Sequence, residues 1–220
     1  MGNNAKSITR RRLITAAATS LVMAQPLIVT GIASAARLQA TPRQTKGPFY
    51  PVQWKGDIDN DLVVVTGIDA QAMGQVLHIK GQVRDTHGTV LPGTVIEIWQ
   101  VDNNGVYLHP EDNRGGRRVE KGFQGRGRTR TDDDGRYSFR TIRPVPYPGR
   151  TPHIHFRVKA PGRRALSTQL YFKGETRNKG DWLFNSVGNA DLRAMLITDP
   201  QPYNHVEADA EIGYFDIVIA

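Results

Sequence analysis

Short runs of alternating apolar and polar residues fill most of the chain beyond residue 75. The runs cover 76–83, 94–99, 136–142, 153–158, 169–172 and 213–219. Clusters of Asp, Asn and Gly separate them, as at 102–105 and 132–135. Alternation with a period of two between such turn residues indicates β-strands, and many short strands of this kind are typical of a sandwich. The pattern predicts an all-β fold, an antiparallel β-sandwich with long loops, and a single short helix around 189–196.

The first 35 residues have a different pattern. Residues 1–12 are polar and basic, and residues 13–36 carry no charge. Arg10, Arg11 and Arg12 precede the uncharged run as in a twin-arginine export signal, and residues 33–35 (ASA) fit a cleavage site after Ala35. We predict that 1–35 is a twin-arginine-type signal peptide, that the protein is exported to the periplasm or the extracellular space, and that no membrane span remains after cleavage. An uncleaved anchor is the alternative, because the uncharged run is long enough to span a bilayer.

The chain length and the absence of cysteine narrow the chemistry. A chain of 220 residues with 0 Cys is expected to form one domain without disulfides, and it has no thiolate metal site, iron–sulfur cluster or Cys nucleophile. Any metal must therefore be held by nitrogen and oxygen atoms. After the leader we predict a polar linker over 36–46 and one folded domain over 47–220.

The net charge of +8 arises partly in the leader, where the basic residues have no acid beside them. A second basic stretch runs from 114 to 130, and its mixture of Gly and Arg predicts a solvated loop. Attraction of an anionic aromatic acid is the functional alternative for this stretch. No nucleic-acid partner is expected, because no recognised binding motif accompanies the charge.

The His153-Ile154-His155 run is the sharpest local signal for chemistry. On a strand, residues i and i+2 point to the same face, so both imidazoles project together. Histidine is the commonest metal-ligating side chain, and two on one face supply half of a coordination sphere. No Asp or Glu follows at short spacing, which leaves a two-histidine, one-carboxylate site without local support. Tyr107, in a turn, and Tyr147, in a proline-rich segment, are the better-placed oxygen donors.

Several ordered motifs carry a resemblance to a known family. They are 45–51 (TKGPFYP), 91–93 (LPG), 95–100 (VIEIWQ), 102–107 (DNNGVY), 129–132 (TRTD), 135–139 (GRYSF), 141–144 (TIRP) and 151–156 (TPHIHF). Together they resemble the intradiol ring-cleavage dioxygenases, most closely the β-subunit type of protocatechuate 3,4-dioxygenase. The resemblance covers residues 45 to about 174 and continues more loosely to the end, so it identifies 47–220 as the catalytic domain.

The resemblance also implies a metal and its ligands. In this family a non-haem Fe(III) is held by two tyrosinates and two histidines, which match Tyr107, Tyr147, His153 and His155 here. Tyr147 and His153 would be the axial pair, with Tyr107 and His155 equatorial. Arg150 and Gln169 match an arginine and a glutamine that lie beside the substrate in the family.

The implied reaction is cleavage of a catechol-type ring by O₂ between its two hydroxyl-bearing carbons, which yields a muconate-type diacid. The substrate that the resemblance implies is a small aromatic diol. Tyr147 would accept a proton from it, and Arg150 would stabilise the negative charge that develops on the ring. The resemblance further implies an oligomer, either of identical chains or with a related second subunit.

Two other classes of protein share parts of this pattern. Residues 88–93 and 131–139 also fit transthyretin-like modules, so a non-catalytic β-sandwich that binds or carries a ligand is the main alternative. The four ligands and Arg150 distinguish the two, because a scaffold has no need of them. A zinc hydrolase built on His153 and His155 would need a third histidine or a Glu base nearby, and neither is apparent in the sequence.

Overall fold

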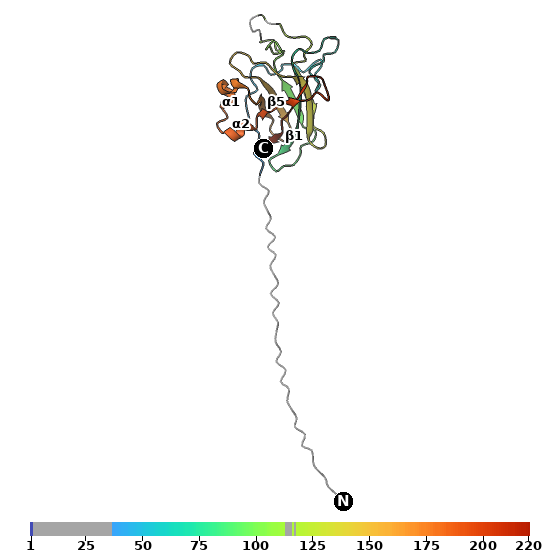
Figure 1. Ribbon diagram of the computed structural model, residues 1–220, viewed down its shortest axis with the longest axis vertical. Helices are drawn as coiled ribbons and strands as arrows, with labels where there is room; N and C mark the ends of the chain where they lie inside the picture. The colour runs from blue at the N-terminus through green and yellow to red at the C-terminus, as the bar shows by residue number, and fades with distance from the viewer. Residues whose placement is uncertain (2–36, 113–115, 117) are drawn as a thin grey trace. The chain divides into compact units, whose positions relative to one another are not determined.

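The computed structural model describes Met1 and residues 37–112, 116 and 118–220 (Figure 1). The predicted signal peptide lies almost entirely outside the described residues and stays a prediction. Residues 37–220 contain two five-stranded sheets and little helix, which confirms the predicted predominance of β-structure. Within the described part of the chain, no helix is long and apolar enough to cross a membrane.

The first sheet is built around β1 (Val76–Asp85). β4 (Arg136–Ile142) pairs with it antiparallel, in a register that runs from Val76 opposite Ile142 to Gln82 opposite Arg136. Two strands pair with β1 in parallel, β9 (Glu211–Tyr214) and β10 (Ile217–Ile219). β8 (Gln201–Pro202) extends this sheet beyond β9. The sheet is therefore mixed: the predicted antiparallel pairing holds for β1 with β4 and for β8 with β9, but β1 pairs with β9 and β10 in parallel.

The second sheet carries the strand with the two histidines. Its order is β3 (Arg126–Arg130), β2 (Val95–Trp99), β5 (His153–Lys159), β6 (Leu166–Phe172) and β7 (Ile197–Thr198). All neighbours are antiparallel except β6 and β7. β5 lies at the centre of the sheet, so its position is set from both sides.

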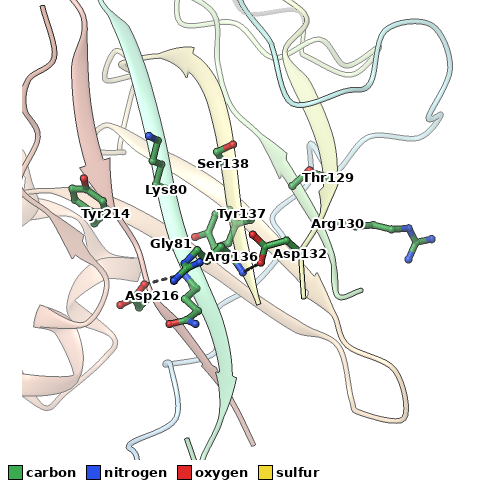
Figure 2. A pocket seen from close by; sticks show the side chains of 11 residues that line it. Lys80, Gly81, Thr129, Arg130, Asp132, Arg136, Tyr137, Ser138, Tyr214 and Asp216 are labelled. Atoms are coloured by element: carbon green, nitrogen blue, oxygen red, sulfur yellow. Dashed lines mark hydrogen bonds between the residues drawn. The ribbon is translucent and has the colours of Figure 1, made fainter. Parts of the chain in front are cut away.

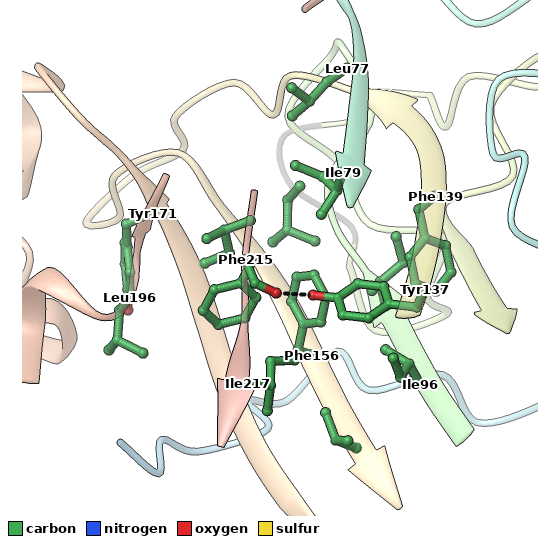
Figure 3. Packing of buried hydrophobic residues seen from close by; sticks show 14 of the residues in the cluster. Leu77, Ile79, Ile96, Tyr137, Phe139, Phe156, Tyr171, Leu196, Phe215 and Ile217 are labelled. Atoms are coloured by element: carbon green, nitrogen blue, oxygen red, sulfur yellow. Dashed lines mark hydrogen bonds between the residues drawn. The ribbon is translucent and has the colours of Figure 1, made fainter. Parts of the chain in front are cut away.

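Apolar side chains from both sheets form one core cluster (Figure 3). The ring of Phe156 on β5 lies 5.0 Å from the ring of Phe215 and 6.3 Å from that of Tyr137 on β4, between ring centroids. The Tyr137 hydroxyl donates a hydrogen bond of 2.6 Å to the carbonyl oxygen of Phe215. Each fully buried apolar side chain of this kind contributes roughly 1.5–3 kcal/mol to stability. The core thus fixes the inner face of β5, while His153 and His155 occupy its other face.

The basic stretch predicted as a solvated loop ends in a strand, which corrects that prediction for 126–130. Gly127 lies so close to the backbone of Asp59 and the side chain of Leu62 that a Cβ would approach each to 2.5 Å. Arg128 donates through Nη2 to the fully buried carboxylate of Glu97, at 2.7 Å. The glycine permits close packing and the ion pair neutralises the buried acid, so this arginine is not a free surface cation.

Three short helical segments follow β6. They are the 3₁₀ helix η2 (Thr176–Gly180), α1 (Trp182–Asn185) and α2 (Ala190–Ala194). α2 lies where a helix was predicted, and Asn189 caps it by accepting from two backbone N–H groups. The other two were not predicted: η2 has no buried residue, and α1 is a single turn of four residues.

The segment 37–46, predicted as a linker, is bonded to the folded unit. Three of its backbone N–H groups donate to carbonyl oxygens of the sheets and their loops: Leu38 to Thr86, Thr41 to Val218 and Gln44 to Ser167. The side chains of Thr41 and Gln44 are buried. We call residues 37–46 the N-terminal segment. It is a structural part of the domain rather than a spacer.

Candidate metal centre

His153 and His155 lie on the same face of β5 and are both buried, 2% and 3% exposed. Their Nε2 atoms are 3.2 Å apart. The residue between them, Ile154, is fully buried in the core on the opposite face. The strand therefore brings the two imidazoles together as its alternation predicts.

Tyr107 is placed by a tight turn just past β2. The Asp102 carboxylate accepts a hydrogen bond from the backbone N–H of Val106 at 3.0 Å, and Gly105 takes a positive φ of 76° inside the turn. The backbone N–H of Tyr107 itself donates to the Asp112 carboxylate at 2.7 Å. Asp side chains that accept from nearby N–H groups stabilise such turns. These contacts hold the phenol in the interior, where Tyr107 is only 2% exposed.

Tyr147 is placed by a second turn, formed with Pro148 and Gly149. The N–H of Arg150 donates to the carbonyl of Tyr147 at 2.9 Å, and Gly149 has a φ of 79°. Proline followed by glycine with positive φ suits the two central positions of a type II turn. The turn leads directly into β5 and sets Tyr147 and Arg150 at its start.

The donor atoms of these four side chains converge. The Tyr107 Oη atom lies 2.9 Å from His155 Nε2 and 3.2 Å from His153 Nε2, and Tyr147 Oη lies 3.4 Å from both Tyr107 Oη and His153 Nε2. Ligands about 2 Å from one metal ion lie about 3 Å from one another, so this spacing fits a single ion. The choice of an axial pair stays a prediction.

The chemistry of the four donor atoms also suits a trivalent metal ion. Two phenol oxygens and two imidazole nitrogens are hard or borderline donors, and a bound trivalent cation strongly favours the deprotonated phenolate. Among the described residues, no group of three or more His, Cys, Asp or Glu could hold a metal. The zinc hydrolase alternative therefore lacks its third conventional ligand in this part of the chain.

The two histidines are oriented in different ways. The Nδ1 atom of His153 lies 2.7 Å from the carbonyl oxygen of Thr151, to which it donates, so Nε2 keeps its lone pair for a metal. The His155 ring instead stacks on the indole of Trp99, with centroids 4.7 Å apart and an interplanar angle of 10°. Its Nδ1 has no hydrogen-bond partner among the described residues. Burial, and then the neighbouring His153 and Arg150, hold the pKa of His155 well below its usual value, which favours the neutral ligand form.

Arg150 is fixed beside this cluster by an acid that sequence reasoning missed. Its Nε donates to Asp181 Oδ2 at 2.8 Å, and its Nη2 donates to Gln169 Oε1 at 2.7 Å. Burial opposes the charge of Arg150, but the bond and the charge of Asp181 outweigh it and raise the arginine pKa. The guanidinium therefore stays positive and in a defined position.

Asp181 uses both oxygens of a fully buried side chain. Oδ1 accepts from the backbone N–H groups of Leu183 and Phe184 and so caps α1, while Oδ2 accepts from the N–H of Thr151 as well as from Arg150. Burial raises its pKa, but these bonds dominate and lower the pKa overall. An Asp just before an apolar helical run is a recognisable cap signal, whereas its bond to Arg150 has no signature in the sequence.

Further residues that the sequence did not predict as part of the site lie around Gln169. The Gln169 Nε2 group donates to the carbonyl of Thr45 at 3.3 Å, and the Tyr171 hydroxyl lies 3.0 Å from Gln169 Oε1 and 3.1 Å from Gln44 Oε1. The Gln44 amide is itself oriented by donating to the carbonyl of Leu183 at 2.9 Å. Burial raises the pKa of Tyr171, so its hydroxyl remains a donor. The N-terminal segment thus supports the side chains next to Arg150.

Tyr147 and Arg150 line a cleft of about 600 Å³ whose other wall comes from η2 and the start of α1. We call it the Tyr147 cleft. A second cleft of about 600 Å³ lies over β1 and β4 (Figure 2), and none of the four Tyr and His residues lines it. Both of its carboxylates accept from backbone N–H groups, Asp132 from Arg136 and Asp216 from Gln82. Of these two clefts, only the Tyr147 cleft is lined by a candidate ligand, Tyr147 itself.

Comparison with known proteins identifies the family. A family model described as Dioxygenase matches residues 45–220. The protocatechuate 3,4-dioxygenase beta chain of Burkholderia cepacia is 34% identical over 187 residues, which cover 80% of this chain and 78% of the relative. Hydroxyquinol 1,2-dioxygenase of Nocardioides simplex is 31% identical over 164 residues, so the match covers 66% of this chain and only 52% of that protein.

Comparison with solved structures gives the same family. The dioxygenase domain of a dioxygenase and carbohydrate-binding protein fusion from Streptomyces sp. SirexAA-E has a TM-score of 0.63 and 32% sequence identity, and the match covers 82% of this chain and 98% of that one. The chain belongs to the intradiol ring-cleavage dioxygenase family. It is an enzyme of the class that cleaves catechol-type rings, which sets aside the non-catalytic scaffold as the main alternative.

Proposed function

We propose that Tyr107, Tyr147, His153 and His155 hold a non-haem Fe(III), with which the enzyme uses O₂ to open a catechol-type ring between its hydroxylated carbons. The convergence of the four donor atoms at 2.9–3.4 Å is the observation that carries this proposal. When bound, a ferric ion would supply the Lewis acidity that favours the doubly deprotonated diol. The product would be a muconate-type diacid.

The residues around the ligands have separate roles in this proposal. Tyr147 lines the cleft and would accept a proton at Oη from a substrate hydroxyl. Arg150 would stabilise negative charge as it develops on the ring, since a fixed and partly buried cation needs no reorganisation during the reaction. Gln169 holds the Nη2 group of this arginine and would keep it oriented toward the substrate.

The test is a measurement of metal content and colour in the purified full-length protein. We expect about one iron per chain, a visible tyrosinate-to-iron band, and a shift of that band when catechol is added without oxygen. Tyr107→Phe should lose the band and the turnover of catechol, whereas Tyr214→Phe, at an exposed tyrosine, should keep both. Labelled O₂ should deliver both atoms to the product. A colourless protein that binds only zinc would overturn the proposal.

We also propose that the two sheets form a sandwich, that the protein is exported, and that it assembles into an oligomer. The shared core cluster supports a sandwich of the two sheets. The twin-arginine-type leader supports export, a route that suits a protein folded around its metal. The similarity to a beta chain supports an oligomer, with copies of itself or with a related subunit.

A further inference from the structure

A row of three side chains crosses the first sheet in the cleft over β1 and β4, which we call the β1–β4 cleft (Figure 2). Lys80 on β1 pairs with Ser138 on β4 and with Tyr214 on β9, and residues paired in this way point to the same face of a sheet. Their strand neighbours Ile79 and Phe139 are buried in the core, so the row faces outward. Strands lie about 4.8 Å apart, so the row is about 10 Å long.

Tyr214 presents an aromatic ring at one end of this row. It is 64% exposed, and its ring stacks on no ring of the described residues. Its backbone is fixed on both sides, because its N–H donates to Thr198 Oγ1 at 3.0 Å and the N–H of Phe215 donates to the carbonyl of Lys80 at 2.9 Å. A rigidly held aromatic ring offers apolar contact area at a low cost in conformational entropy.

The charges that line the β1–β4 cleft are separated but sum to zero. Lys80 and Arg130 supply two positive charges, and Asp132 and Asp216 supply two negative ones. None of these four residues forms an ion pair within the described part of the chain. The remaining charged residue, Arg136, pairs with an acid outside the cleft. The cleft therefore has no net attraction for an anion or a cation, and its chemistry favours a neutral polar ligand.

The polar groups of this cleft keep hydrogen-bonding capacity that the fold does not use. The hydroxyls of Thr129 and Ser138 bond to no residue that the structure describes, and neither do the Oδ2 atoms of Asp132 and Asp216. Lys80 Nζ donates to a tyrosine hydroxyl outside the cleft at 3.0 Å, which uses one of its three N–H donors. Acceptors and donors are thus both available beside the aromatic ring.

We propose that the β1–β4 cleft binds a neutral glycan, with one sugar ring against Tyr214 and its hydroxyl groups on Lys80 and Asp216. A sugar ring has broad faces of C–H groups and a rim of hydroxyls that both donate and accept, which matches an aromatic ring bordered by ammonium and carboxylate groups. Hydrogen bonds to such charged groups are about twice as strong as those between neutral groups. The row of about 10 Å is longer than one sugar ring, so the ligand is a chain of sugars.

The β1–β4 cleft and the Tyr147 cleft share no lining residue. A glycan bound over β1 and β4 would therefore leave the Tyr147 cleft open to a small aromatic diol. The site would hold the enzyme on a polysaccharide while small substrates are turned over elsewhere on the domain. The inference does not depend on the proposed ring cleavage, and either can fail without the other.

The experiment is calorimetric titration of the full-length protein with cellohexaose, which is neutral, and with hexagalacturonate, which is anionic. We expect the wild type to bind the neutral chain more tightly. Tyr214→Ala should weaken that binding by about tenfold or more, because the apolar face is lost. Asp216→Asn should weaken it severalfold, since the charge is lost while Oδ1 still accepts from the N–H of Gln82. Trp182→Ala is the matched control, because it removes an aromatic residue that is 66% exposed and does not line the cleft.

Losses in Tyr214→Ala and Asp216→Asn, with normal binding in Trp182→Ala, would support the glycan site. No binding of cellohexaose by the wild type, tighter binding of the anionic chain, or equal losses in Trp182→Ala would overturn it. Urea unfolding of each variant shows whether a loss of binding reflects a loss of folding, and Asp216→Asn tests the site independently of Tyr214. Co-sedimentation with insoluble cellulose then separates the two sources of sugar. Retention on the polymer would support anchoring, whereas binding of the soluble chain alone would overturn it.

Discussion

The Nε atom of Arg150 and the Oδ2 atom of Asp181 are 2.8 Å apart, and this pair joins the candidate active site to the cap of α1. Because one carboxylate serves both structures, its charge and its capping function can be separated by substitution. Asn is as good a helix cap as Asp but carries no charge. This contrast provides the first prediction.

Asp181→Asn should keep α1 in place while releasing the ionic hold on Arg150. We expect kcat for catechol to fall about tenfold to a hundredfold, since a mispositioned charge stabilises the developing anion less well. The unfolding free energy should fall by about 1–3 kcal/mol, because a mostly buried guanidinium loses its anionic partner. The tyrosinate-to-iron band should be unchanged. Steady-state kinetics, urea unfolding and visible spectra check these outcomes, and an unchanged kcat would contradict the role of the pair.

Trp99 should control iron affinity through the His155 ring. Trp99→Leu removes the stacked surface, and with no bond at Nδ1 from the described residues the imidazole would lose its main orienting contact. Loss of groups that orient metal ligands commonly costs about 10–100-fold in affinity. Trp99→Phe is the matched control, because it keeps an aromatic face and should lose much less. Competition with an iron chelator measures both variants, and equal losses would show that cavity formation matters rather than stacking.

Gln44 should influence turnover from the N-terminal segment. Gln44→Met keeps the length of the side chain but removes its bonds to Tyr171 and to the carbonyl of Leu183. We expect kcat to fall by about tenfold or less while iron content stays the same, because the lost contacts support Arg150 only through neighbours. Gln53→Met, at an exposed glutamine, should have no effect. A loss of iron in Gln44→Met would show that the segment supports the ligands instead.

Glu207 should contribute stability that is lost in acid. Its bonds to Arg140, and then to His78, lower the carboxyl pKa from an ordinary value of 4.5 to about 2. A depressed folded-state pKa gives stability that is present above the unfolded value and lost as pH falls through the folded value. The stability difference between wild type and Glu207→Gln should therefore be full above about pH 4.5 and vanish near pH 2.

Urea unfolding across this pH range measures that difference directly. Asp133→Asn, at an exposed acid, should show no comparable pH-dependent difference from wild type. A Glu207→Gln curve that stays parallel to wild type down to pH 2 would mean that the ion pair contributes nothing to stability.

Strands with one apolar face could be predicted from the sequence, and strands without one could not. The alternation at 76–83 and 153–158 located β1 and β5, because the core covers one face of each. β3 reads Arg-Gly-Arg-Thr-Arg and has no apolar position. Its place depends on the close approach of Gly127 to Leu62 and on the ion pair between Arg128 and Glu97. These contacts are tertiary, and local pattern carries no information about them.

The candidate site also contains residues that could be predicted from the sequence and residues that could not. The four candidate ligands, Arg150 and Gln169 belong to motifs or to a local alternation, and the structure brings all six side chains into one neighbourhood. Asp181 and Gln44 were missed because their partners are distant in the chain. Arg150 is 31 residues from Asp181, and Tyr171 is 127 residues from Gln44. The identity of such a residue does not reveal its hydrogen-bond partner, because only the folded structure brings the two residues together.

The N-terminal segment has a consequence for how this protein folds. Its bonds to Gln169 and Tyr171 span 124 and 127 residues, so the earliest and the late parts of the domain must meet before Arg150 is fully supported. Contacts of such long range close slowly, because the loop entropy is lost before they can form. During synthesis the segment emerges long before β6 exists. The last event in folding would then be the packing of residues 44 and 45 against β6, and full support of Arg150 would lag behind the formation of the two sheets.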